Sequence, residues 1–252
     1  MSRLFHLGVR MIDGRRLAAL SVHGFTALGA VLGFQALLEA AAHRWEASFA
    51  WLGVALIVDG ADGPLARRIG VTDHLPRFSG ERLDLIIDYI TYVLVPAFIL
   101  YEAQLMPEGL GWLGASLALL SSLFHFSDKE SKTSDGFFVG FPAIWNVVAF
   151  YMLIFATPAI VNLAIVAILA VLTFVPQKWV HPVRVVRLRG VTIAVVIVWS
   201  LAAIAVLFMG FPAPFILQAI FAVSMIYLVA VGVLPAPAHD GAPNPHSKSD
   251  AG

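Results

Sequence analysis

The chain has 252 residues, of which 60% are hydrophobic and only 13% are charged, and its mean hydropathy is +0.86. A chain of this length and composition is too apolar for a soluble domain. The formal net charge of zero argues against nucleic acid as a partner. Because the sequence has no cysteine, disulfides and thiolate metal sites are excluded.

The two ends of the chain differ from its apolar middle. Residues 1–16 alternate arginines with apolar side chains, which predicts a cytoplasmic interfacial arm lying on the membrane. A frayed basic tail fits the same composition. Residues 235–252 are rich in Pro, Ala, Ser and Asp, which predicts a disordered cytoplasmic tail.

The middle of the chain, residues 17–234, contains apolar segments that each approach the ~20 residues needed to cross a bilayer. We therefore expect an all-α fold, a polytopic membrane helical bundle of about eight transmembrane helices. The expected spans are 17–40, 46–66, 83–105, 109–126, 139–157, 159–176, 190–210 and 213–234.

Basic residues are distributed unevenly between the connections. Eight spans place every one of the 16 Lys and Arg residues except Arg44 on the same side of the membrane as both termini. Lys and Arg are retained on the cytoplasmic side of membrane proteins. We therefore expect both termini in the cytoplasm.

Four aspartates lie at the facing ends of the second and third spans. Asp59 and Asp62 are three residues apart, and Asp84 and Asp88 are four apart, so each pair shares one face of its helix. A helix–turn–helix brings the two pairs together, and close carboxylates stay ionised only when cations neutralise them. Divalent cations prefer such oxygen ligands. The pattern predicts a metal site at the cytoplasmic face.

Two other uses of these carboxylates remain open. They would tie down the connecting loop if they paired with Arg67, Arg68 or Arg82. They would also serve a proton or cation relay, as in a cation transporter, although all four lie at one face rather than along a path across the membrane.

The aspartates belong to a longer pattern, Asp59-x2-Asp62-Gly63-x2-Ala66-Arg67-x12-Gly80-x3-Asp84-x3-Asp88. It resembles the signature of the CDP-alcohol phosphotransferases at all eight defining positions, with a longer spacer than is usual. The resemblance implies an integral membrane enzyme that transfers a phosphatidyl or phospho-alcohol group from a CDP-linked donor to an alcohol, with domain limits at 17–234.

The resemblance also implies a role for each signature residue. All four aspartates would hold one or two divalent cations, and Asp88 would take the proton of the attacking hydroxyl as the catalytic base. The residues implied in nucleotide binding are Asp62, Gly63, Ala66, Arg67 and Gly80. Homodimer formation is implied by the same resemblance.

The sequence that flanks the signature resembles one branch of this family, the bacterial phosphatidylcholine synthases. The matching stretches are Leu75-Pro76-x2-Ser79-Gly80, Ile87-Asp88-Tyr89-x-Thr91-Tyr92-Val93 and the segment from Asp128 to Asn146. This likeness implies CDP-diacylglycerol and choline as substrates, phosphatidylcholine and CMP as products, Mn²⁺ or Mg²⁺ as cofactor, and a site at the cytoplasmic face of a bacterial inner membrane, among membrane lipids.

Choline carries a quaternary ammonium, which binds to aromatic faces and carboxylates. The candidates near the predicted cytoplasmic face are Tyr89, Trp145 and Asn146. Aromatic residues at this depth are more often part of the interfacial belt. A relative that uses serine, inositol phosphate or glycerol phosphate as the alcohol therefore remains an alternative.

Overall fold

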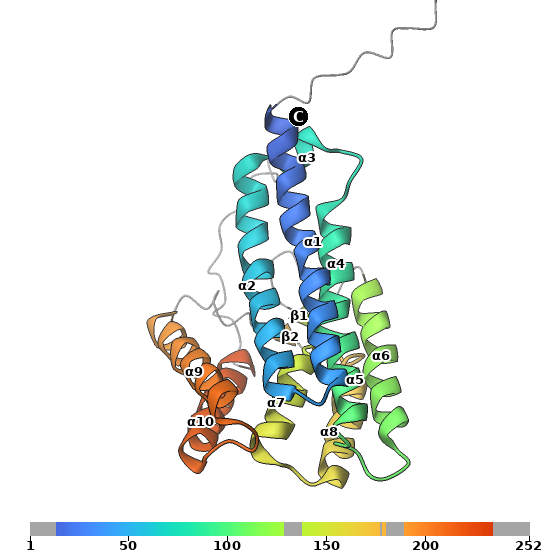
Figure 1. Ribbon diagram of the computed structural model, residues 1–252, viewed down its shortest axis with the longest axis vertical. Coiled ribbons are helices and arrows are strands. Elements are labelled where there is room, and N and C mark those ends of the chain that lie inside the picture. The colour runs from blue at the N-terminus through green and yellow to red at the C-terminus, as the bar shows by residue number, and fades with distance from the viewer. Residues whose placement is uncertain (1–13, 129–137, 177, 180–188, 234–252) are drawn as a thin grey trace, which may run out of the picture.

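The computed structural model describes residues 14–128, 138–176, 178–179 and 189–233, and these form a bundle of helices (Figure 1). The helices are α1 (Gly14–Ala41), α2 (Trp45–Ile69), α3 (Val71–His74), α4 (Gly80–Asp88), the π-helical η1 (Tyr89–Leu94), α5 (Val95–Glu102), α6 (Gly111–Ser127), α7 (Trp145–Phe155), α8 (Ala159–Leu172), α9 (Arg189–Met209) and α10 (Phe215–Val233). Two short strands, β1 (Phe138–Val139) and β2 (Lys178–Trp179), pair antiparallel.

The expected all-α membrane bundle is confirmed. Four helices are long and apolar enough to cross a membrane, namely α1, α2, the continuous helix Gly80–Glu102 and α9, and shorter apolar helices accompany them. Each of the predicted spans corresponds to a helical segment, with α4, η1 and α5 together forming the third.

The fifth segment is shorter than predicted. The sequence pattern places its start near residue 139, but α7 begins at Trp145. Residues before it are held in another conformation: Gly140 has φ +78°, and the Phe141 amide donates to the Leu172 carbonyl at 3.1 Å. Pro142 also disfavours helix at the residue before it.

The terminal predictions are only partly within the described ranges. Helix α1 begins at Gly14, so the last residues of the predicted arm, Arg15 and Arg16 among them, are helical. Residues 1–13 and the predicted tail 235–252 lie outside the described residues.

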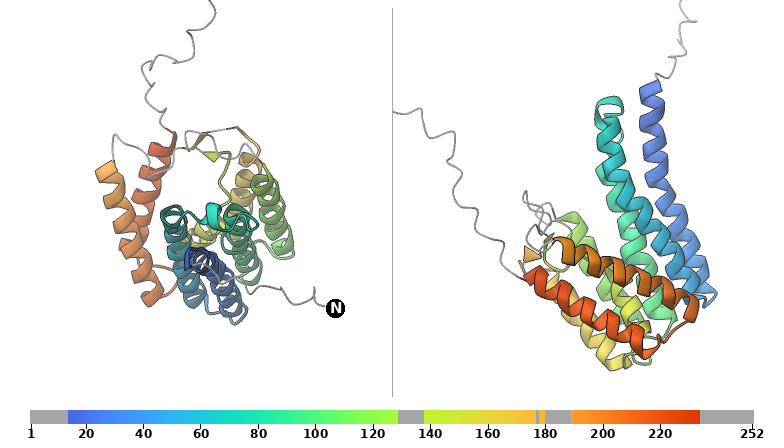
Figure 2. Two further views of the ribbon diagram at one scale, coloured as in Figure 1. Left: turned by 90° about the horizontal axis from the view of Figure 1, so that it is seen from above. Right: turned by 90° about the vertical axis from the view of Figure 1, so that its left-hand side faces the viewer.

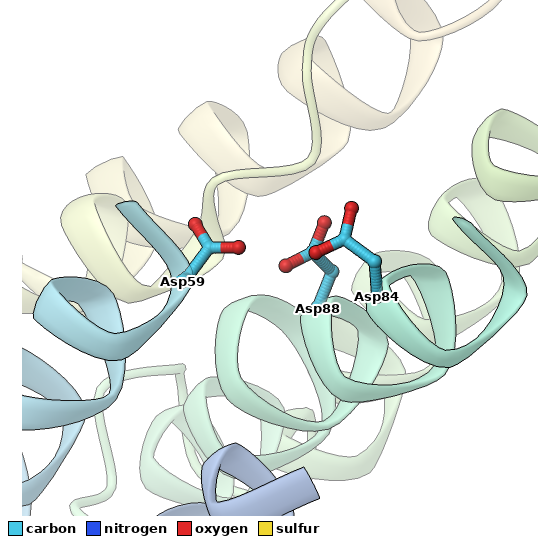
Figure 3. A group of neighbouring side chains, drawn as sticks. All are labelled: Asp59, Asp84 and Asp88. Carbon is cyan, nitrogen blue, oxygen red and sulfur yellow. The ribbon is translucent and has the colours of Figure 1, made fainter. Parts of the chain in front are cut away.

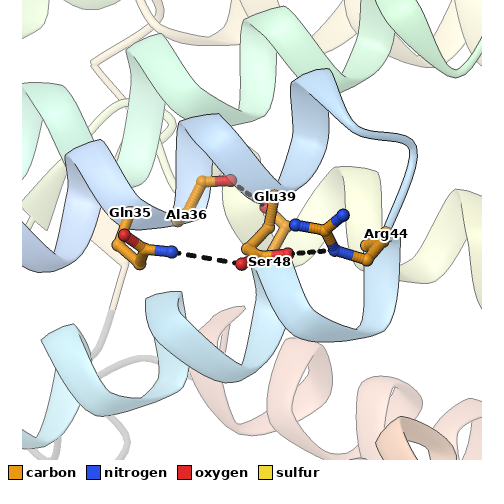
Figure 4. Close-up of polar contacts among 5 residues, drawn as sticks. All are labelled: Gln35, Ala36, Glu39, Arg44 and Ser48. Atoms are coloured by element: carbon orange, nitrogen blue, oxygen red, sulfur yellow. Dashed lines mark hydrogen bonds and ion pairs between the residues drawn. The ribbon is translucent and has the colours of Figure 1, made fainter.

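Helices α1 and α2 run antiparallel and pack along much of their length (Figure 1). The buried Ser48 hydroxyl of α2 donates to the Ala36 carbonyl of α1 at 2.8 Å. Beside it, Glu39 accepts hydrogen bonds from Gln35 and from Arg44, which closes the turn between the helices (Figure 4).

Helix α1 also packs against the third segment. Two of its glycines are buried there, and an added Cβ would lie 2.5 Å from Ile87 at Gly29 and 2.8 Å from Ile90 at Gly33. Glycine therefore permits an approach that any side chain would block.

The α9–α10 pair lies beside α2 and is tilted relative to it (Figure 2). An aromatic cluster fastens this pair to the rest of the bundle. Phe150 of α7 contacts the rings of Phe49, Trp199, Phe211 and Phe221 at centroid distances of 4.9–6.2 Å. These contacts join α2, α7, α9, α10 and the turn between α9 and α10.

Four connections gather at the end of the bundle that holds the α1–α2 turn. His43 lies 3.5 Å from Glu102, the Asn162 amide donates to the Leu105 carbonyl at 2.8 Å, and the Phe211 amide donates to Glu46 at 3.2 Å. The connection between α2 and α4 lies at the opposite end (Figure 1). The helices therefore alternate in direction along the chain.

Candidate active site

Three of the four signature aspartates converge between α2 and α4. Asp59, Asp84 and Asp88 are half-buried, and each offers a carboxylate oxygen within 4.8 Å of those of the other two. Figure 3 shows Asp59 facing the other two across the gap between the helices. Oxygen donors at this spacing suit a hard divalent cation, so the residues present fit the expected metal.

Local sequence explains how α4 presents its pair. The Ser79 hydroxyl accepts a hydrogen bond from the Arg82 amide at 3.2 Å and caps the helix, which begins at Gly80. Asp84 and Asp88 then follow one turn apart on one face. Tyr92, one further turn along, donates its hydroxyl to Asp59 Oδ2 at 2.9 Å.

Asp62 takes a different position from the other aspartates. It is not part of the three-residue cluster, and it is only 7% exposed. Its side chain lines a cavity of about 510 Å³ between α1, α2 and the start of α4.

The same cavity is lined by every residue predicted to bind nucleotide. They are Asp62, Gly63, Ala66, Arg67 and Gly80. Asp84 borders both this cavity and the acidic cluster, so the two parts of the site adjoin. A ligand that fills the cavity therefore reaches the carboxylates.

Sequence reasoning missed three cavity residues on α1. Val22, His23 and Thr26 line the cavity, and the His23 imidazole lies 3.3 Å from the position that a Cβ on Gly80 would occupy. No pattern in the sequence marks them, because their place depends on how α1 packs against α4. Tyr92 appeared only within the flanking stretch that resembles the family, and its spacing of four residues from Asp88 was the available signal.

Within the described ranges, the basic residues of the signature region do not tie down the aspartates. None of Arg67, Arg68 and Arg82 forms an ion pair there with an aspartate.

None of the three predicted choline residues lines the cavity, and two of them contact α6. Tyr89 donates its hydroxyl to the Leu119 carbonyl at 3.1 Å, and Trp145 donates Nε1 to Ser122 at 2.7 Å, one turn further along α6. Trp145 is completely buried, so choline would reach its ring only if surrounding side chains moved. Asn146 accepts a hydrogen bond from the Val147 amide at 2.9 Å.

The fold and the site define the class of the molecule: a helical membrane protein with a candidate divalent-cation site beside a ligand-sized cavity. No protein-family model matches the chain. Among curated proteins, it is 48% identical to the phosphatidylcholine synthase of Mesorhizobium japonicum over 72% of this chain and 68% of that protein.

Other relatives match over more of their length. The phosphatidylcholine synthase of Rhizobium johnstonii is 42% identical over 86% of this chain and 90% of its own. That of Pseudomonas aeruginosa is 43% identical over 78% of this chain and 83% of its own. The chain belongs to the phosphatidylcholine synthase family.

Proposed function

We propose that this membrane enzyme condenses CDP-diacylglycerol with choline to give phosphatidylcholine and CMP. The observation that carries the proposal is its similarity to phosphatidylcholine synthases over most of the chain. The signature residues support it, because their carboxylates converge beside a cavity that the predicted nucleotide residues line.

The acidic cluster is proposed to hold a divalent cation. Asp59, Asp84 and Asp88 would provide the ligands, and Asp62 would join them from the cavity wall if a second ion binds. Mn²⁺ and Mg²⁺ both suit carboxylate oxygens. When bound, such a cation supplies positive charge that neutralises the pyrophosphate of the donor.

The chain's own residues would bind and activate the two substrates. Asp62, Gly63, Ala66, Arg67 and Gly80 hold the nucleotide in the cavity, where the glycines leave room for a flat ligand. Asp88 accepts the proton of the choline hydroxyl while the oxygen attacks the phosphorus that bears diacylglycerol. The new P–O bond forms as the bond to CMP breaks, and CMP leaves with the electron pair.

The choline site is proposed to lie on the α6 side of the aspartates. The hydroxyl of Tyr89 bonds the Leu119 carbonyl of α6, and on that side its ring is the first candidate for contact with the quaternary ammonium. Trp145 and Asn146 lie at the start of α7 and would shape the wall behind it. The anionic cluster adds a favourable charge for a cationic substrate.

The orientation follows from the charge distribution. We place the aspartates and both termini at the cytoplasmic face of a bacterial inner membrane, because the predicted spans assign almost all basic residues to that side. The donor lipid would enter from the surrounding bilayer, and two chains would associate as a homodimer by likeness to the wider family.

The direct test is an assay of purified protein with CDP-diacylglycerol, MnCl₂ and labelled choline. We expect labelled phosphatidylcholine and an equal amount of CMP. Product from serine, inositol phosphate or glycerol phosphate in place of choline would overturn the choline assignment. Cation uptake into proteoliposomes without any lipid product would favour the transporter alternative.

A further inference from the structure

A phenol outside the signature contacts the acidic cluster. Tyr92 donates its hydroxyl to Asp59 Oδ2 at 2.9 Å, across the gap between the third helical segment and α2. Its side chain is partly buried. Asp59 is the one cluster member on α2, whereas Asp84 and Asp88 share α4 (Figure 3).

This difference matters for how the cluster is assembled. Asp84 and Asp88 are held in register by one turn of a single helix. Asp59 has no such constraint relative to them, so its carboxylate must be oriented by a contact from elsewhere. Tyr92 supplies that contact from the helix that carries the other two.

The backbone around Tyr92 is itself well fixed. Residues Tyr89–Leu94 form a π-helical segment in which the Val95 amide donates to the Ile90 carbonyl, five residues back. The Thr91 hydroxyl bonds the Ile87 carbonyl at 3.0 Å, and Val93 is completely buried. π-Helical turns occur often at functional sites, where they redirect side chains.

We propose that Tyr92 is a positioning residue for the cation site: its hydroxyl holds the Asp59 carboxylate so that it faces Asp84 and Asp88. The inference rests on the proposed metal function of these aspartates. Hydrogen bonds to ligand side chains commonly account for a 10- to 100-fold difference in metal affinity. Without the hydroxyl, Asp59 must lose rotational freedom each time an ion binds, which weakens binding.

The test is a Mn²⁺ titration of purified Tyr92→Phe in lipid nanodiscs without substrate. Binding is measured as the decrease in the electron paramagnetic resonance signal of free Mn²⁺. We expect a dissociation constant raised about 10- to 100-fold. The matched control is Tyr101→Phe, which removes a phenol hydroxyl from an exposed position at the far end of the same continuous helix, Gly80–Glu102, and its Mn²⁺ affinity should equal that of the wild type.

Mn²⁺ affinity of Tyr92→Phe within twofold of the wild type would overturn the inference. If the wild type and Asp59→Asn bind Mn²⁺ equally, the proposed metal site itself fails. Should Tyr92→Phe not purify in folded form, the Mn²⁺ concentration that gives half-maximal formation of labelled phosphatidylcholine is measured in native membranes. An increase relative to Tyr101→Phe supports the positioning role, and no change overturns it.

Discussion

Asp88 lies where the acidic cluster meets the π-helical segment, since its carboxylate belongs to the cluster and its main chain leads directly into that segment. The other two aspartates of the cluster are held in place in different ways. Asp84 depends on regular helix geometry, and Asp59 depends on a hydrogen bond from Tyr92.

At this scale, Asp88→Asn is expected to lower turnover about 100-fold or more, because it removes the proposed base and one negative ligand. The substitution keeps the size of the side chain, so the thermal unfolding midpoint in detergent should change little. The rate of labelled choline incorporation at saturating substrate measures the effect. Near-normal turnover would exclude Asp88 as the base.

Gly80→Ala tests the cavity. Its new methyl would lie 3.3 Å from the His23 ring, so the ring or the start of α4 must shift into the space for the nucleotide. We expect the KM for CDP-diacylglycerol to rise roughly three- to tenfold with little change in kcat.

Gly60→Ala is the matched control for Gly80→Ala, because an added Cβ there meets nothing within 4 Å. It should leave the KM for the donor lipid unchanged. Equal KM values for the two variants would show that the cavity beside His23 is not where the nucleotide binds.

The acidic cluster could be predicted from residue spacing, since i, i+3 and i, i+4 pairs at facing helix ends must approach one another. The separation of Asp62 from the other three could not, because it depends on how α2 is rotated against α4. The same rotation places Tyr92 on Asp59, whereas the packing of α1 against α4 places His23 beside Gly80.

At the scale of the elements, the contact between α1 and α4 holds the site together. Ile87, which directly precedes Asp88, occupies the space that a side chain at Gly29 would need. The glycine thus sets how closely α1 approaches the helix that carries two of the aspartates.

Gly29→Ala should therefore destabilise the protein, because its methyl would lie 2.5 Å from Ile87 Cγ2 and force the helices apart. We expect a loss of about 1–3 kcal/mol, seen as a lower thermal unfolding midpoint in detergent. Gly24→Ala, with nothing within 4 Å, should be neutral or slightly stabilising. Identical midpoints for both variants would contradict this packing.

The helices themselves follow from apolar runs of membrane-spanning length, so most of them were predictable. The β1–β2 pair and the late start of α7 were not. They depend on Gly140, where an added Cβ would lie 2.3 Å from the Thr173 carbonyl, a contact between segments remote in sequence. The π-helical segment likewise leaves no mark in the apolar pattern.

For the whole molecule, the alternating direction of the helices predicts which connections lie on which side of the membrane. Since the chain has no cysteine, single cysteines report position without a background signal. Arg77→Cys, in the connection near the aspartates, should react with a membrane-impermeant maleimide only when the cytoplasmic face is accessible.

Glu108→Cys lies in the connection at the opposite end and serves as the counterpart to Arg77→Cys. It should react in cells whose outer membrane is permeabilised and whose inner membrane is intact, because the reagent then reaches only the outer face of the inner membrane. Labelling of both positions from the same face would refute the alternation of spans.

The short α8 has a consequence for the surrounding bilayer. Its 14 residues form a rod about 21 Å long, against a hydrocarbon thickness of about 30 Å, and Ile160, Ile168 and Val171 are exposed along it. A helix of this length that crosses the bilayer draws the headgroups inward and thins the lipid beside it. The enzyme would then act in a locally thinned region of the bilayer, where lipid headgroups lie deeper than elsewhere in the leaflet.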